Sequence, residues 1–286
     1  MTRFTLQVRK AERFTALSLR NRTSTLSAID PGGGPVVSLT SHGERIATVH
    51  LTMESIAAGT VRPERLILWL DDHAAVADPT PGLRRLIRRG AEIRLSENYR
   101  PHTKYYPYVQ SLDRHRAPLV TADDDLLYPR TWLERLLSAH AGDPRTNTAH
   151  RSREVSFRSG ALTPYETWPE VGQGPASPRN LATGTWGHLI VPPMLDALRD
   201  REDEFRAQAP AADDLWLHRV AVETGVAAKV TGAYRHRDFL HLPDGGAALS
   251  THNVDGRGND GQIATAWSAS LRAAILEATA PVNRYL

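Results

Sequence analysis

The stretch LVTADDDLLYP, residues 119–129, places three consecutive aspartates directly after a short apolar segment. Residues 119–122 have the length and composition of a buried parallel strand. Asp123 and Asp125 are two positions apart, so in extended backbone both side chains point to one side. Three adjacent carboxylates repel one another, and a divalent cation among them would relieve that repulsion. Carboxylate oxygens suit Mg²⁺ or Mn²⁺, and such an ion would in turn bind a diphosphate.

Strands alternate with helices around this stretch. Short apolar or β-branched runs predict further strands at 36–40, 66–70 and 91–95. Helical spacing predicts helices over 44–58, 83–89 and 104–115, and one that opens at Pro129. This order predicts an α/β fold in which a mostly parallel sheet is flanked by helices. Ligands of such sheets bind beyond the carboxyl ends of the strands, which favours a metal site at the aspartates over a solvated acidic loop or a helix cap.

The second half of the chain has a less regular pattern. Its Pro, Gly, Ser and Thr residues predict loops over the site at 154–182, and a glycine-rich stretch predicts a mobile loop at 243–261. A strand is predicted at 183–191, and helices are predicted from residue 213 and over 260–278.

Residues 1–34 form a basic N-terminal extension. They carry six Lys and Arg against two Asp and Glu, and they end in the flexible run PGGGP. We interpret the extension as a segment that packs against the main domain or frays. A basic contact to an anionic membrane surface is the alternative.

The composition excludes several classes of protein. The 286 residues contain no cysteine, which excludes disulfide frameworks, thiolate nucleophiles and cysteine-ligated metal centres. No apolar run is long enough to span a bilayer, and the N-terminal MTRFTLQVRK lacks the apolar core of a secretory signal. The net charge is only +3, and no nucleic-acid-binding motif stands out, so we expect no nucleic-acid partner. We expect a cytoplasmic protein with at most peripheral membrane contact.

Five stretches together resemble the GT-A glycosyltransferases, whose Rossmann-like, nucleotide-sugar-dependent fold carries a DxD metal motif. They are VVSLTSHGERI, RLILWLDD, HTKYYPYVQ, TADDDLLYPRTWL and ADDLW. The chain is most similar to bacterial enzymes related to family 2 that make cell-surface glycans. The resemblance covers residues 35–286, and in the second half it is confined to islands. It implies a nucleotide-sugar half, 35–140, and an acceptor half, 141–286.

The resemblance implies a donor site in the first half. Residues implied to contact the donor are Thr40, Ser41, Arg45, Asp71, Asp72, Lys104 and Asp124. Either Asp71 or Asp72 would hold the base. Lys104 also stands out by itself, because the chain has few lysines and a compact ammonium upstream of the aspartates would neutralise donor phosphates. Each assignment has an alternative. The Ser and Thr residues would only cap the next helix, Asp71 and Asp72 would only end a strand, and Lys104 would be an ordinary exposed lysine at the start of a helix.

The metal and catalytic groups are implied in the same way. Asp123 and Asp125 would bind Mn²⁺ or Mg²⁺, with His252 as a further ligand. Asp214, or else Asp213, would take a proton from the acceptor hydroxyl in an inverting transfer. The alternative for this pair is a pair of acids at the start of a helix.

Trp186 lies in GTWG, residues 184–187, which resembles the strand on the acceptor side of these enzymes. It would stack on a sugar, although a buried core tryptophan fits the pattern as well.

The predicted reaction moves a sugar from a nucleotide-diphosphate donor, most simply a UDP-sugar, to a glycan or another hydroxyl acceptor. Two alternatives remain. A sugar nucleotidyltransferase shares this sheet and its metal, but the glycine- and arginine-rich phosphate loop expected after its first strand is absent. A non-catalytic glycan- or nucleotide-binding module would not require the aspartates, Lys104 and Asp214 together.

Overall fold

The computed structural model of the chain describes residues 3–32, 34–242 and 258–278. Within these ranges the main sheet has seven strands, in the order β12, β6, β11, β4, β1, β2, β3. Their bounds are β1 Val36–Thr40, β2 Arg65–Leu70, β3 Glu92–Leu95, β4 Leu119–Ala122, β6 Asn147–Ala149, β11 His188–Ile190 and β12 Ala228–Val230. Neighbouring strands are parallel except at β11, which runs antiparallel to β4 and β6. The predicted α/β fold with a mostly parallel sheet is confirmed.

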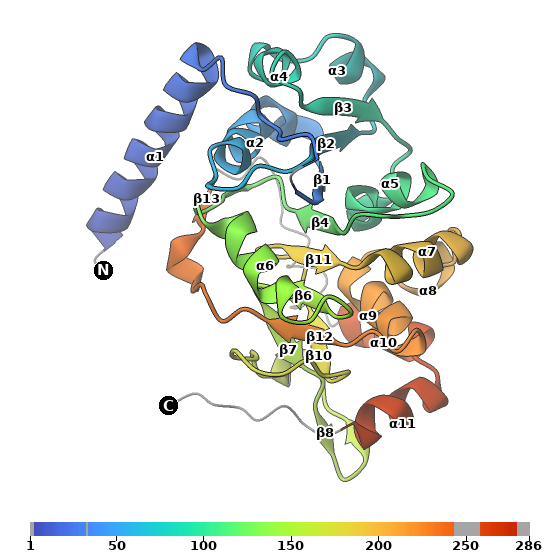
Figure 1. The fold of residues 1–286 in the computed structure, drawn as a ribbon. Coiled ribbons are helices and arrows are strands. Elements are labelled where there is room, and N and C mark those ends of the chain that lie inside the picture. The colour runs from blue at the N-terminus through green and yellow to red at the C-terminus, as the bar shows by residue number, and fades with distance from the viewer. Residues whose placement is uncertain (1–2, 33, 243–257, 279–286) are drawn as a thin grey trace.

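Helices lie on both faces of this sheet (Figure 1). On one side are α2 Val49–Ala57, α4 Pro81–Ile87 and α6 Trp132–Ala141. On the other side are α5 Tyr106–Gln110, α7 Pro192–Asp200 and α9 Asp213–Glu223. The central strands are apolar at nearly every position because neither face of the sheet meets water, and Val37, Leu68 and Val120 are fully buried.

The remaining elements are short. They are the helices α3 His73–Ala77, α8 Phe205–Gln208, α10 Gly258–Ala266 and α11 Ala269–Glu277, and the 3₁₀ helices η1 Gly43–Ala47, η2 Arg100–Lys104, η3 Tyr165–Thr167 and η4 His236–Asp238. Three two-stranded ribbons join β5 Leu126–Leu127 to β13 Leu240–His241, β7 Ser152–Glu154 to β10 Asn180–Ala182, and β8 Phe157–Arg158 to β9 Ala161–Leu162. Of the helices in the described ranges, none is long and apolar enough to cross a membrane.

Several predicted elements differ in detail from the observed ones. The helix expected over 44–58 starts as η1 and becomes α-helical at Val49, and the one expected over 104–115 is divided between η2 and α5. The strand expected at 183–191 is reduced to β11, because Trp186 and Gly187 have φ angles of 77° and 111°, which end extended backbone.

The later predictions are also modified. The helix expected over 260–278 is split into α10 and α11, and Ser268 caps the second by accepting a hydrogen bond from the Leu271 N–H. The segment 154–182 contains β8, β9, η3 and β10. Most of the loop predicted at 243–261 lies outside the described residues.

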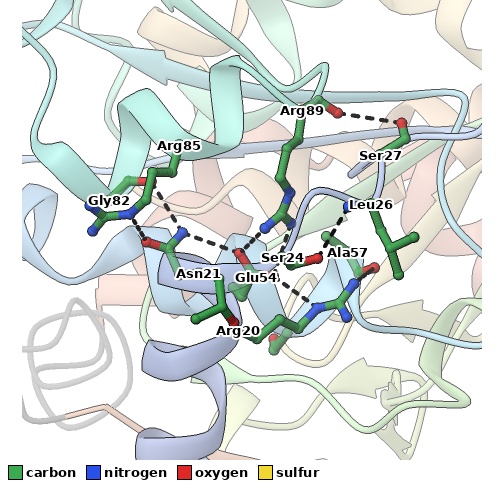
Figure 2. Close-up of polar contacts among 12 residues, drawn as sticks. Arg20, Asn21, Ser24, Leu26, Ser27, Glu54, Ala57, Gly82, Arg85 and Arg89 are labelled. Carbon is green, nitrogen blue, oxygen red and sulfur yellow. Dashed lines mark hydrogen bonds and ion pairs between the residues drawn. The ribbon is translucent and has the colours of Figure 1, made fainter.

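The first helix, α1 (Arg3–Thr23), packs on the outer side of α2 and α4 (Figure 1). Its last turn meets the fully buried carboxylate of Glu54 on α2, which lies 2.9 Å from both Arg20 and Arg89 and accepts a hydrogen bond of 3.1 Å from Asn21 (Figure 2). A buried carboxylate is tolerated when such partners surround it. Most of the basic segment therefore forms a helix that is fastened to the domain.

Candidate functional site

A cavity of about 720 Å³ opens at the edge of the sheet where the parallel strands end. The first half of the chain lines it with residues that follow β1, β2, β3 and β4. The second half contributes residues of β7, of the turn before β11 and of the start of α9. The cavity therefore lies at the edge of the sheet where ligands of such folds bind, and both halves of the chain line it.

The aspartates after β4 are tied to the end of β1. Asp124 is buried, and its carboxylate accepts hydrogen bonds from the Ser41 hydroxyl (2.6 Å) and from Arg45 (3.1 Å). Asp123 and Asp125 are half-buried. Asp123 lies 3.1 Å from the Lys104 ammonium, and Asp125 lies 3.8 Å from Arg45. Ser41 and Arg45, which the sequence assigns to the donor, thus also hold the aspartate turn in place.

A bound cation would relieve the charge repulsion around Asp125. Burial, and then the charges of Asp123 and Asp124, raise the pKa of Asp125 to about 6 in spite of Arg45. The carboxylate oxygens of Asp123 and Asp125 match the ligand chemistry of Mg²⁺ and Mn²⁺. Nowhere in the described ranges do three or more His, Asp or Glu side chains form a metal-holding group. A cation here would need further oxygen ligands, for example from a bound diphosphate. The predicted additional ligand, His252, lies outside the described residues.

Lys104 joins the two acidic groups of the cavity. Its ammonium is buried and lies 3.1 Å from Asp123 and 3.3 Å from Asp213. Burial acts to lower the pKa of Lys104, but Asp213, Asp123 and Asp214 together raise it above its ordinary value. Gly184 leaves the space for this ammonium, because a Cβ at that position would lie only 3.2 Å from it.

Asp213 and Asp214 begin α9 on the opposite wall. Asp214 accepts a hydrogen bond of 2.7 Å from the backbone N–H of Gly184. Burial, and then the charge of Asp213, raise the pKa of Asp214 to about 7, whereas Lys104 opposes the shift. A carboxyl group with a pKa near 7 can accept a proton at neutral pH and release it again.

The other predicted residues divide into those that line the cavity and those that do not. Thr40 and Asp71 line it. Asp72 caps α3, where its carboxylate accepts hydrogen bonds from two backbone N–H groups. Trp186 is buried outside the cavity, and its ring stacks on Phe239 with the ring centroids 4.9 Å apart.

Several cavity residues are absent from the sequence-based prediction, and two pairs of them interact in the cavity walls. Asn98, after β3, donates a hydrogen bond of 2.6 Å to Asp71 and accepts one of 2.8 Å from the backbone N–H of Arg100. Arg100 has a φ of 55°, a conformation that is strained for a side chain of this size. On the other wall, the Arg153 guanidinium lies 5.3 Å from the centre of the Tyr165 ring. The position of Asn98 after a strand indicates a cavity residue, whereas no local pattern in the sequence marks Arg153 or Tyr165 as one.

No family model matches the chain, and no curated protein matches it. Among solved structures, the chain is similar to the mannosyltransferase PcManGT from Pyrobaculum calidifontis, determined in complex with GDP-Man and Mn²⁺. The two share 15% sequence identity with a TM-score of 0.44. The match covers 79% of this chain and 64% of that chain, so this chain spans less than two thirds of the matched structure.

Proposed function

We propose that the protein transfers a sugar from a nucleotide-diphosphate donor to a hydroxyl acceptor. The observation that carries this proposal is the meeting of two carboxylate groups, Asp123–Asp125 and Asp213–Asp214, across Lys104 in one cavity. The first group suits a cation with its diphosphate, and the second contains a carboxyl group suited to accept a proton. A cavity of about 720 Å³ has the size of ordinary small-molecule sites.

The donor lies along the ends of β1, β2 and β4 in this proposal. Asp71 and Arg100 contact the nucleoside side of the donor. Asp123 and Asp125 would hold Mn²⁺ or Mg²⁺, and such an ion would supply positive charge against the negative charge of the departing diphosphate. Lys104 adds a positive charge at the same wall, and its ion pairs keep it in place before the donor arrives.

Asp214 is the proton acceptor for the transfer. The acceptor oxygen forms a bond to the anomeric carbon of the sugar while its proton passes to Asp214. The bond from that carbon to the phosphate oxygen breaks, and the electron pair leaves with the nucleoside diphosphate. Attack from the face opposite the diphosphate inverts the anomeric centre. The hydrogen bond from the Gly184 N–H fixes one carboxylate oxygen, which orients the other toward the reacting hydroxyl.

The first test is a thermal-shift screen of nucleoside diphosphates and nucleotide sugars, with and without Mn²⁺ or Mg²⁺. A ligand that binds the folded state raises its melting temperature by mass action. UDP-sugars, predicted from the sequence, and GDP-mannose, which is bound in the similar structure, both belong in the screen. We expect a metal-dependent shift with one nucleotide class that Asp125→Asn abolishes and that Asp113→Asn, at an exposed position outside the cavity, leaves intact.

The second test is turnover. Asp214→Asn should bind the donor as the unmodified protein does and lose transfer by at least about 100-fold, because general base catalysis contributes about 10²- to 10⁴-fold. Normal turnover by Asp123→Ala and Asp125→Ala would remove the metal step. A shift with nucleoside triphosphates only, together with pyrophosphate release, would point to a nucleotidyltransferase. Ligand binding without turnover would point to a binding module.

A further inference from the structure

The helix α1 exposes more apolar surface than its place in the fold explains. The described residues include eight large hydrophobic side chains that are exposed, and four of them lie within the first 26 residues: Val8, Phe14, Leu19 and Leu26. Leu19 and Leu26 are 60% and 61% exposed. Isolated exposed hydrophobic residues are ordinary, but a concentration on one segment marks a contact surface.

Two exposed apolar residues of α1, Val8 and Leu19, lie opposite the face that packs on the domain. Leu17 is buried in a cluster with Leu51, Leu127 and Leu240, and Leu6 packs against the same cluster. These residues form the inner face.

Val8, Ala11, Thr15 and Leu19 follow one another at helical spacings of three and four, so they form one stripe, and all four are exposed. The stripe faces away from the domain, and Figure 1 shows α1 at the edge of the molecule.

Positive charge is concentrated on the same segment. Residues 1–34 carry six Lys and Arg against two Asp and Glu, a formal charge of +4, while the whole chain has +3. The remaining 252 residues therefore carry a formal charge of −1 in total. Arg20 pairs with Glu54, but among the described residues no carboxylate lies within ion-pair distance of Arg9, Arg13 or Arg22.

The arginines along α1 also lie close to one another. Arg9 donates a hydrogen bond to the Arg237 carbonyl, and Arg13 donates one to the Tyr128 carbonyl. Burial, and then the nearby charges of Arg130, Arg9 and Arg20, lower the pKa of Arg13. Such a cluster of like charges is stabilised by an anionic partner.

We propose that α1 binds the surface of an anionic lipid bilayer while it stays packed on the domain. The stripe from Val8 to Leu19 enters the boundary between headgroups and acyl chains, and Arg9 at its side and Arg22 at its C-terminal end contact lipid phosphates. A second copy of this chain fits less well, because pairing two such helices would bring two +4 segments together. A nucleic acid would use the charges but would leave the apolar stripe exposed.

The stripe can be altered without unfolding the helix, because the contacts that fasten α1 are on its other face. Glu54 holds Arg20 and Asn21, and Leu17 lies in the apolar cluster. Substitutions at exposed positions usually change stability by less than about 0.5 kcal/mol. Changes at Val8, Leu19 and Arg22 leave these contacts intact, and Arg9→Ala removes one exposed hydrogen bond, to the Arg237 carbonyl.

Co-sedimentation of the full chain with vesicles tests the proposal. Vesicles of phosphatidylcholine alone are compared with vesicles that also contain phosphatidylglycerol, at low and high salt. We expect binding to the anionic vesicles, weaker binding at high salt, and little binding to the neutral ones. The double variant Arg9→Ala, Arg22→Ala should bind about thirtyfold more weakly, since each basic residue near the surface contributes about 1 kcal/mol. The double variant Val8→Asp, Leu19→Asp should lose binding.

The matched control is Leu112→Asp with Arg116→Ala, an exposed apolar residue and an exposed arginine outside α1, which should bind as the unmodified chain does. Absence of binding to anionic vesicles would overturn the proposal, as would equal losses in the control and in the α1 variants. Loss of a dimer on gel filtration in Leu19→Asp, without vesicle binding by the unmodified chain, would assign the stripe to self-association instead. These outcomes are independent of the sugar-transfer reaction, which is measured in the absence of vesicles.

Discussion

Replacing Lys104 with methionine tests the charge balance of the cavity. The ammonium lies 3.1 Å from Asp123 and 3.3 Å from Asp213, and its side chain is buried. Methionine has a similar length and no charge, so Lys104→Met leaves these carboxylates and Asp214 without their cation. Removing one partner of a buried ion pair typically lowers the free energy of unfolding by about 3–5 kcal/mol. We expect a loss of that size at pH 8.

The loss should decrease as the pH falls. The pKa of Asp214 is raised to about 7, mainly by burial, whereas an unfolded aspartate titrates at about pH 4. The folded state therefore binds more protons than the unfolded state between about pH 4 and pH 7, so this group's contribution to stability falls as the pH rises through that window. Without Lys104, which opposes this shift, the pKa of Asp214 rises further. The penalty of the variant therefore grows as the pH rises above about 7 and is smaller near pH 5.

Urea titrations at pH 8 and pH 5 measure this difference. Lys229→Met, at a half-buried lysine on β12, is the matched control and should cost less than about 1 kcal/mol. Adding Asp213→Asn to Lys104→Met should restore part of the stability, because a neutral amide needs no counter-ion. A loss below about 1 kcal/mol at pH 8, or equal losses at the two pH values, would refute the reasoning.

Three further predictions concern the stability of the fold. Glu54→Gln removes the charge that Arg20 and Arg89 share, and it should lower the free energy of unfolding by about 3 kcal/mol in urea titrations; a neutral result would show that the network does not hold α1. Burial lowers the pKa of His188 to about 3, whereas the same histidine in the unfolded chain has a pKa of about 6.5. As the pH falls below about 6.5, the unfolded state therefore binds a proton that the folded state does not, and the free energy of unfolding decreases by about 2 kcal/mol between pH 6.5 and pH 5. The variant His188→Leu should lack this part of the acid loss in urea titrations at pH 7 and pH 5, and an unchanged pH slope would contradict it. Gly187→Ala should lower the free energy of unfolding by about 2 kcal/mol, because φ there is 111° and the added Cβ would lie 2.7 Å from the Trp132 ring. The melting temperature measures this loss, and an unchanged value would show that the turn relaxes.

The elements of the sheet were largely predictable because their signals are local. The segments 36–40, 66–70 and 119–122 are short apolar runs, and each forms a strand buried on both faces. The alternation of these runs with helical patterns predicts parallel strands, so the polar residues that follow them meet at one edge. The aspartates after β4 and Asp71 after β2 therefore line one cavity, as the pattern indicates.

The pattern of residues along the chain alone predicted the α/β class, the edge of the sheet at which the cavity opens and the acidic groups near it, because hydrophobic periodicity depends on neighbours along the chain. The folded structure decided which of those groups meet. Asp71 and Asp72 are equivalent in the sequence, yet one lines the cavity and the other caps α3. Lys104 lies between Asp123 and Asp213, which come from different halves of the chain. Burial and Coulomb interactions act through space, so the charge balance of the cavity exists only once distant segments have packed together.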